Sequence, residues 1–508
     1  MADYCIVYKK LGEVFMDIKE WLPIFSVSAE TDRDLQEYFF HTPEINKIIN
    51  SGHWLVLGRK GTGKTAIYKY LESANYAEIN NYHTISLNFK DYPWPAHRLY
   101  KESLAGELSA YQKSWKFLFI IKLLSKLIHV KEDQSEKLSK ELKWAKEYIE
   151  KIFGNPNPSL MEVLFSKLLR MKKMKGPSVD LEDIDFNVGE VSFDDVAGSK
   201  ELQESLRSNA FSLLIYFEKI YLENAGKHKF IIMLDQLDEN WLTDEIEEYS
   251  KILINLINVC RNISVDDGYS DNVKIIPFLR TDIYDSLRFN DKNKLLQDSA
   301  ILINWDNESL DNMFFERIKK YKPETLSLIM ERKSGSLFEV EFVRQGTPPF
   351  NFITRRSFFR PRDVITYFNK IHDIHSINKT GLYSSKNLYD AAPDTSTSIY
   401  NEIIDEWSNQ FPNIERLLSV LQIISVETFS YLVFQEKYKN EFIDSTEVDM
   451  RRDLMFLFNN SIIGQKKQGR WEYLSSLQNL KLNIEKDFRT HQSLKYRLQL
   501  VESRSAQV

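Results

Sequence analysis

The strongest constraint on the fold of this chain is a glycine-rich segment that follows a short apolar run. Residues Gly58 to Thr65 match the pattern G-x-x-x-x-G-K-[ST], with a strand-like pattern before them and helical spacing after them. The three glycines allow positive φ and let backbone N–H groups approach phosphate oxygens. We therefore predict a phosphate-binding loop between a buried strand and a helix, formed by Gly58, Arg59, Lys60, Gly61, Thr62, Gly63, Lys64, Thr65 and Ala66.

Two side chains of this loop have distinct chemical tasks. Lys64 is expected to place a compact positive charge on the β- and γ-phosphates, and Thr65 to offer its hydroxyl to Mg²⁺. The helix that starts here turns the positive end of its dipole toward the bound anion. The alternative is a chance match to a glycine-rich turn, and the flanking strand and helix patterns argue against it.

A second apolar run, from Lys229 to Asp235, ends in an acidic residue. Because α/β sheets present ligands at the carboxyl ends of their strands, Asp235 is predicted to hold Mg²⁺ opposite Thr65. The alternative role for such an aspartate is a helix cap, which suits Asp238 or Asp244 better.

Gln236 occupies the position at which many hydrolytic P-loop enzymes carry a glutamate that orients the attacking water. Asp238 and Glu239 are the candidates to replace that glutamate, and Asp238 is preferred. Slow turnover is therefore the expectation.

Arginines follow two further elements. Arg280 ends the apolar strand Asn272 to Leu279, where it could neutralise charge on the γ-phosphate in the transition state. A structural pair with Asp282 or Asp285 is its alternative role. Arg360 and Arg362 flank the start of a predicted helix. They could reach nucleotide from a lid or a neighbouring subunit, or could bind a backbone carbonyl or an acidic helix instead.

Composition narrows the classes of function. The chain has 508 residues, a formal net charge of −6 and a pI near 6.0, which argues against a globally basic nucleic-acid coat. Two cysteines cannot form a disulfide framework, so a reducing cytosol is the simplest location. No leader pattern and no run of spanning length stands out, and lysines interrupt the most apolar segment, Trp115 to Ile128, which we interpret as an amphipathic helix.

Strands that alternate with helical segments predict an α/β fold with a parallel P-loop NTPase sheet. The expected parts are an N-terminal helical segment (1–50), the core (51–310) with a helical insertion at about 95–227, a helical lid (311–398) and a C-terminal winged-helix-like domain (399–508). Within them we predict a helix at Thr31 to Phe40 and a linker at Asp390 to Ser398. Wing residues Lys466, Lys467 and Arg470 could touch a phosphate backbone, although a protein contact is favoured.

With these pieces in order, the chain resembles bacterial P-loop ATPases of the AAA+/STAND type, a class that includes KAP-like ATPases and regulators in antiviral defence. The resemblance covers about residues 30–370 and is carried by Gly58 to Thr65, Asp235 to Glu239, Arg280 and Arg360 to Arg362. In that class the second acid often lies three positions after the Mg²⁺ aspartate, where Asp238 stands. The resemblance implies ATP and Mg²⁺ as cofactors, switching or oligomerisation driven by nucleotide, and a separate effector protein as partner.

Three hypotheses about function remain open. The first is an ATPase that switches conformation or assembly, as a homo-oligomer or a hetero-complex, to control its effector. The second is an ATP-locked scaffold with little hydrolysis. The presence of Gln236 keeps this hypothesis open. The third is a DNA-dependent motor, whose binding would weaken steeply with salt. A small-molecule kinase is disfavoured because no separate substrate pocket is evident.

Overall fold

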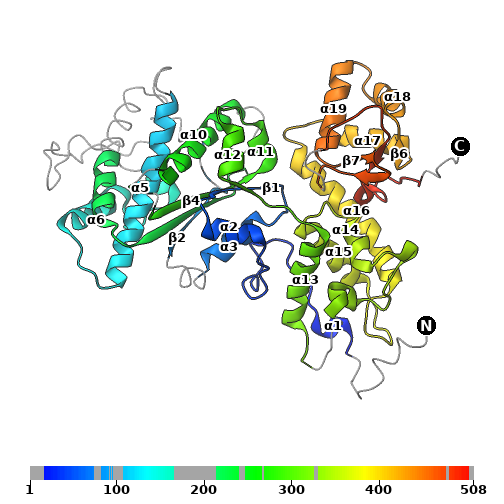
Figure 1. The fold of residues 1–508 in the computed structure, drawn as a ribbon, viewed down its shortest axis with the longest axis horizontal. Helices are drawn as coiled ribbons and strands as arrows, with labels where there is room; N and C mark the ends of the chain where they lie inside the picture. Colours follow the sequence, from blue (N-terminus) through cyan, green and yellow to red (C-terminus); the bar gives the residue numbers. More distant parts are fainter. Residues whose placement is uncertain are drawn as a thin grey trace. The chain divides into compact units, whose positions relative to one another are not determined.

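The computed structural model describes residues 16–73, 82–90, 92, 94, 107–164, 213–238, 246–265, 268–269, 271–324, 330–475 and 480–502. The chain divides into two compact units (Figure 1). One unit, here called the core unit, comprises Pro43–Arg59 and Lys64–Ile303. The other, here called the C-terminal unit, comprises Met1–Thr42, Lys60–Gly63 and Asn304–Val508.

The core unit is built on a five-stranded parallel sheet in the order β2-β3-β4-β1-β5. Its strands are β1 (Leu55–Gly58), β2 (Tyr82–Asn88), β3 (Lys229–Asp235), β4 (Val273–Arg280) and β5 (Ala300–Leu302). Neighbours pair in parallel throughout, and strand β1 is buried along its whole length. This order is typical of P-loop NTPase cores of the AAA+ type, so the predicted fold class is confirmed.

Helices cover both faces of this sheet. Helices α2 and α3 lie on one face and α10 on the other (Figure 1). The bounds of the helices around the sheet are α2 (Pro43–Asn50), α3 (Lys64–Glu72), α10 (Ile246–Val265), α11 (Thr281–Ser286) and α12 (Lys292–Asp298). Parallel strands need such crossover connections, and the helices supply the apolar faces that bury the sheet.

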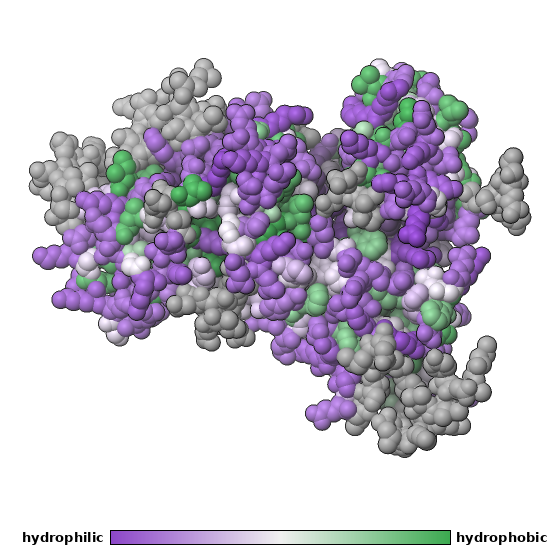
Figure 2. Space-filling view, in the orientation of Figure 1, coloured by the Kyte–Doolittle hydropathy of each residue, from purple (hydrophilic) through white to green (hydrophobic). Residues whose placement is uncertain are grey.

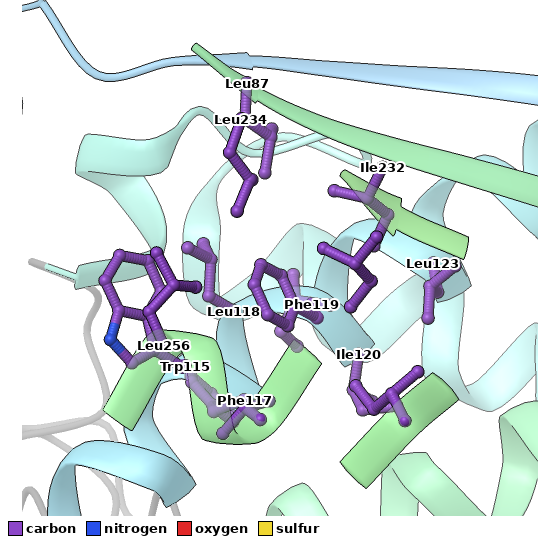
Figure 3. Close-up of a cluster of buried hydrophobic side chains, with 14 of the residues drawn as sticks. Leu87, Trp115, Phe117, Leu118, Phe119, Ile120, Leu123, Ile232, Leu234 and Leu256 are labelled. Carbon is purple, nitrogen blue, oxygen red and sulfur yellow. The ribbon is translucent and has the colours of Figure 1, made fainter. Parts of the chain in front are cut away.

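Between β2 and β3 the chain is helical wherever the structure describes it. These helices are α5 (Glu107–Asp133), α6 (Lys140–Phe153), α7 (Leu160–Leu164) and a helix over residues 213–224. The amphipathic interpretation of Trp115 to Ile128 was wrong in one respect, because α5 is buried on nearly every side. Its side chains pack against β2, β3 and α10 (Figure 3). Even Lys122 is buried, and its ammonium donates to the carbonyl of Pro158.

The first part of the C-terminal unit has its own apolar core. Its elements are α1 (Ile18–Trp21), α13 (Asn307–Tyr321), η4 (Met330–Leu337), η5 (Arg344–Gly346), α14 (Pro349–Thr354) and α15 (Pro361–Ile374). The predicted helix at Thr31 to Phe40 is absent, and that segment forms turns instead. Its acidic side chains bond to α13: Asp34 accepts from the Tyr321 hydroxyl and pairs with Lys320 at 2.9 Å. These contacts outweigh local helix propensity.

The predicted linker at Asp390 to Ser398 was also wrong. It lies inside α16 (Ser385–Trp407), with Pro393 within the helix. Hydroxyl groups bond back to carbonyls four residues earlier, as in Thr395 Oγ1 to the oxygen of Ala391 at 2.9 Å. Small buried residues line this stretch and α16 packs on α15, so a composition typical of linkers here serves close helix packing.

The rest of the C-terminal unit resembles a winged helix, as predicted. Helices α17 (Ile414–Ile424), α18 (Tyr431–Glu441) and α19 (Glu447–Asn459) pack on a small antiparallel sheet in the order β6-β9-β7-β8. Its strands are β6 (Thr428–Phe429), β7 (Ile463–Lys467), β8 (Arg470–Glu472) and β9 (Phe488–Thr490), and a short helix, η6 (Gln492–Leu494), follows them. The predicted hairpin is β7–β8, and Lys466, Lys467 and Arg470 are exposed on it.

The surface is mostly hydrophilic on the face shown, with hydrophobic residues in small groups (Figure 2). In the part of the chain that the structure describes, no helix is both long enough and apolar enough to cross a membrane.

Candidate nucleotide-binding site

The phosphate-binding loop has the backbone that its sequence requires at two of its three glycines. Gly61 and Gly63 have φ of 79° and 95°, a region that residues with a Cβ rarely adopt. Gly58 differs from the expectation, because it has no positive φ. It is the last residue of β1 and lies in register with Arg280 of β4. The strand therefore delivers the loop beside the end of β4.

Lys64 folds back over the start of this loop. Its Nζ donates to the carbonyl oxygens of Gly58 at 3.0 Å and Arg59 at 3.2 Å. Desolvation lowers the pKa of Lys64, and Asp238 is the carboxylate that counteracts this most. The ammonium thus lies among carbonyl dipoles and acidic side chains, at the place where the sequence predicts contact with phosphate.

Asp235 and Thr65 form the predicted metal half of the site. Asp235 ends β3, is only 2% exposed and accepts a hydrogen bond from the Thr65 side chain. Its Oδ2 has no hydrogen-bond partner among the described residues. Burial raises the pKa of Asp235 to about 6, and the Thr65 bond opposes that rise. A buried, unsatisfied carboxylate oxygen beside a hydroxyl fits Mg²⁺, which takes a few protein oxygens and completes its shell with waters and phosphate.

The residues after Asp235 are strained and charged. Gln236 has φ of 60°, which is uncommon for a residue with a long side chain and is often found at functional sites. Asp238 is one-fifth exposed and is the acid that interacts most strongly with Lys64. The structure therefore brings Asp238 to the loop, where its preferred role was predicted. Glu239, the other candidate, lies outside the described residues.

Arg280 is held by two aspartates. It makes a two-pronged contact with Asp282, from Nε at 3.1 Å and from Nη2 at 2.7 Å, and Asp238 Oδ2 lies 3.8 Å from its Nε. Arg280 as a whole is 7% exposed. The structural ion pair that was named as the alternative role of Arg280 is therefore present, and its main partner is Asp282 rather than Asp285. Its place at the end of β4, in register with Gly58, still leaves it beside the loop.

Within the C-terminal unit, the loop residues Lys60 to Gly63 contact the start of α15. Arg360 Nη1 donates to the carbonyl oxygen of Lys60 at 3.3 Å. A Cβ added to Gly61 would stand 3.3 Å from Cβ of Arg362, so this glycine permits a close approach. On the other side, the carbonyl of Thr62 accepts from Trp305 Nε1 at 2.8 Å.

Arg360 and Arg362 also meet an acidic helix, α16. Arg360 lies 3.6 Å from Glu406 and 3.8 Å from Glu402 of that helix, and Arg362 lies 3.8 Å from Glu402. Arg360 lies closer still, at 3.1 Å, to Asp363 in the first turn of α15. Burial alone would lower the pKa of Arg360, but these carboxylates raise it. Sequence reasoning named a carbonyl or an acidic helix as the alternative partner, and Arg360 has both. It missed Glu402 and Glu406 themselves, although their spacing of four places both on one helix face.

Comparison with known proteins finds a family match and a curated relative. Residues 308–403 match the family described as FunZ-associated C-terminal helical domain. The curated relative is the putative transposon gamma-delta 80.3 kDa protein of Escherichia coli (strain K12), which is 21% identical over 423 residues. That alignment covers 80% of this chain and 55% of the relative, so the chain spans about half the length of the curated protein it matches.

Comparison with solved structures finds matches that include the following two proteins. The Aeropyrum pernix ORC2 protein, solved in ADPNP–ADP complexes, is 11% identical with a TM-score of 0.40, and the match covers 92% of this chain and 96% of that one. Cdc6p from Pyrobaculum aerophilum is 10% identical with a TM-score of 0.30, over 96% of this chain and 98% of that one. The fold assignment of this chain rests on its own sheet order and loop, which were described above.

Proposed function

We propose that this chain is a regulatory ATPase that binds ATP with Mg²⁺ and uses slow hydrolysis to switch its conformation or assembly. The observation that carries the proposal is the convergence of Lys64, Thr65 and Asp235 at the carboxyl ends of β1 and β3. A P-loop with a buried acidic partner is the arrangement that binds nucleoside triphosphates with Mg²⁺. The preference for adenine rests on the resemblance to AAA+/STAND ATPases.

Each residue near the loop has a task in this proposal. Lys64 exchanges its two carbonyl contacts for the β- and γ-phosphates, and Thr65 and Asp235 hold the metal, which shields phosphate charge when bound. Asp238 orients the attacking water, because Gln236 cannot accept its proton. Arg280 stabilises charge on the γ-phosphate once its contact with Asp282 loosens.

Two features support slow switching over fast turnover. The position after Asp235 carries Gln236 instead of a glutamate, and Arg280 is engaged by two aspartates. The same features favour the second candidate, a scaffold that binds ATP and hardly hydrolyses it. In both, the partner is a separate effector protein. An antiviral-defence setting follows from the resemblance, and the transposon protein of Escherichia coli supports a mobile-element setting as an alternative.

A steady-state assay of phosphate release separates the two candidates. The wild type is compared with Lys64→Ala and Asp238→Ala, with and without DNA, and Lys69→Ala on the same helix is the matched control. We expect release well above the Lys64→Ala background, with Asp238→Ala reducing it about 10²-fold, as the loss of an acid–base group does.

The other outcomes decide between the remaining candidates. Release at background in every variant, together with tight ATP binding by the wild type, would establish the scaffold and reject the enzyme. Stimulation by DNA that falls steeply with salt would favour the motor.

A further inference from the structure

The C-terminal unit contains a polar cavity of about 530 Å³, whose lining residues lie far along the sequence from the phosphate-binding loop. It lies between the segment that carries η5 and α14 and one side of the small antiparallel sheet. Its volume is in the range of sites that hold small organic ligands. All of its lining residues belong to the C-terminal unit, so its geometry depends on that unit alone.

The lining carries an excess of positive charge in a chain that is acidic as a whole. Five cationic side chains and two carboxylates line it, a formal excess of three positive charges, from Arg344, Arg355, Arg356, Arg489, Lys495, Glu427 and Glu502. Glu427 pairs with both Arg489 and Lys495, and Glu502 pairs with Lys495. The two carboxylates are thus engaged by two of the five cations.

The other three arginines have no ion pair with a carboxylate in the part of the chain that the structure describes. Arg355 donates from Nη1 to Thr347 Oγ1 at 3.3 Å, and Arg344 is exposed. Of these three, Arg356 most strongly indicates an anionic ligand. Its Nη1 donates to the carbonyl of Phe352 at 3.1 Å, its guanidinium lies 3.4 Å from the Phe352 ring centroid, and its buried Nε has no hydrogen-bond partner among the described residues.

A largely buried guanidinium that makes no ion pair is costly, and Glu427 acts on Arg356 only from a distance. Burial lowers the pKa of Arg356, which reflects the cost of its charge in this environment. An anionic ligand would relieve that cost, and arginine forks match the oxygens of phosphate better than any other side chain. Three arginines that line one cavity therefore favour a ligand with several phosphate oxygens, which can accept hydrogen bonds from more than one arginine.

Aromatic rings complete the lining. Tyr389, Trp471 and Tyr496 border the cavity, and Tyr496 is 38% exposed. The Arg489 guanidinium lies over the Trp471 ring at 5.9 Å, which leaves a flat cationic and aromatic surface. Aromatic and guanidinium planes of this kind stack nucleobases without reading their sequence.

We propose that this cavity is a second ligand site, which binds a nucleoside phosphate: the phosphates contact Arg344, Arg355 and Arg356, and the base stacks on Trp471 or Tyr496. The ligand is either a free nucleotide or the 5′-phosphorylated end of a nucleic acid strand, since both present the same chemistry. The site is independent of ATP binding at Lys64 and does not rest on the proposed function.

The test uses the full chain with Lys64→Ala, so that the loop no longer dominates binding. A fluorescent N-methylanthraniloyl-ADP is titrated in, and an oligothymidylate with or without a 5′-phosphate is used as competitor. We expect saturable binding that weakens with salt, a loss of about 10-fold or more in affinity for Arg356→Met, and a smaller loss for Arg355→Ala. Arg451→Ala is the matched control, because Arg451 is an exposed arginine of the same unit, paired with Glu447.

Competition by the two strands distinguishes the two sources of the ligand. A 5′-phosphorylated strand that competes far better than its unphosphorylated form assigns the site to strand ends, and poor competition by both strands assigns it to free nucleotide. Both support the proposal. Arg356 is largely buried, so Arg355→Ala, at an exposed position, covers the case in which Arg356→Met fails to fold. The proposal is overturned if the Lys64→Ala chain binds nothing saturably, if Arg355→Ala and Arg356→Met bind as tightly as Arg451→Ala, or if poly-glutamate competes as well as the nucleotide.

Discussion

The two sheets of this protein assemble polar side chains in different ways. In the parallel sheet, β3, β4 and β1 are adjacent strands that run in the same direction. Residues at their carboxyl ends therefore lie together at one edge of the sheet. Each of these residues lies in a short segment that can be recognised from its sequence pattern. Around the small antiparallel sheet, the basic cavity gathers side chains from isolated positions between Arg344 and Glu502. A site that follows from strand direction is visible in sequence, and a site that follows from packing is not.

Helix α5 packs on the strands that carry the nucleotide-binding site, so we expect the stability of the core unit to depend most on this helix. Trp115 is fully buried, stacks near Phe119 and donates from Nε1 to the carbonyl of Ile252 at 3.1 Å. Trp115→Ala is expected to lower the free energy of unfolding of the core unit by about 3–5 kcal/mol. Urea denaturation measures it, with the half-buried Trp144→Ala as control. Equal losses for the two would contradict a central role for α5.

Asp235→Asn should separate stability from activity in the core unit. The substitution removes a metal ligand, so phosphate release is expected to fall on the order of 10²-fold, as for loss of an essential charged group. Because burial raises the pKa of Asp235 to about 6, removing its charge should stabilise the metal-free protein, by about 3 kcal/mol. Thermal melts in EDTA check this, and a lower melting temperature would show that Asp235 is structurally required.

The C-terminal unit should instead respond to pH. His491 is buried against Phe358, its Nδ1 accepts from the backbone N–H of Ser493 at 3.2 Å, and burial with nearby arginines lowers its pKa to about 3. The unfolded chain binds the proton below about pH 6.5, so stability is full above that pH and falls as the solution is acidified toward pH 3.

Between pH 7 and pH 5 the expected loss is about 2 kcal/mol, measured by urea denaturation of the C-terminal unit's transition. His491→Gln should flatten this dependence, whereas replacement of the exposed His129 should leave it unchanged. A slope that persists in His491→Gln would assign the pH response to other groups.

The smallest expected effect tests whether Asp282 restrains Arg280. Asp282→Asn weakens the two-pronged contact and should raise phosphate release a few-fold, because a freed guanidinium can stabilise transition-state charge. Asp285→Asn, on the same short helix, is the control. A drop in release for Asp282→Asn would mean that the pair positions Arg280 for catalysis instead of restraining it.

Much of the fold was predictable in both units. The strands of the core unit follow from apolar runs, and in the C-terminal unit the start of α15 at Pro361 and the wing hairpin follow from proline position and turn residues. The errors have a common cause. The helix at Thr31 to Phe40 was predicted from a local capping signal and the linker at Asp390 to Ser398 from local composition, and contacts with α13 and α15 decided otherwise. The burial of α5 was missed because three lysines suggested a solvent face that the fold does not give it.

The sequence by itself determined the phosphate-binding loop, the acidic strand end and the alternation of strands and helices that indicates a parallel sheet, because those features need only neighbouring residues and the period of a strand or helix. The order of the strands within that sheet came from the tertiary structure. Tertiary structure alone decided which partner each arginine takes. Arg280 lies with Asp282, Arg360 lies with Glu402 and Glu406, and Arg356 makes no ion pair with a carboxylate among the described residues. An arginine reaches several Å in any direction, so only the packed fold fixes what its charge meets.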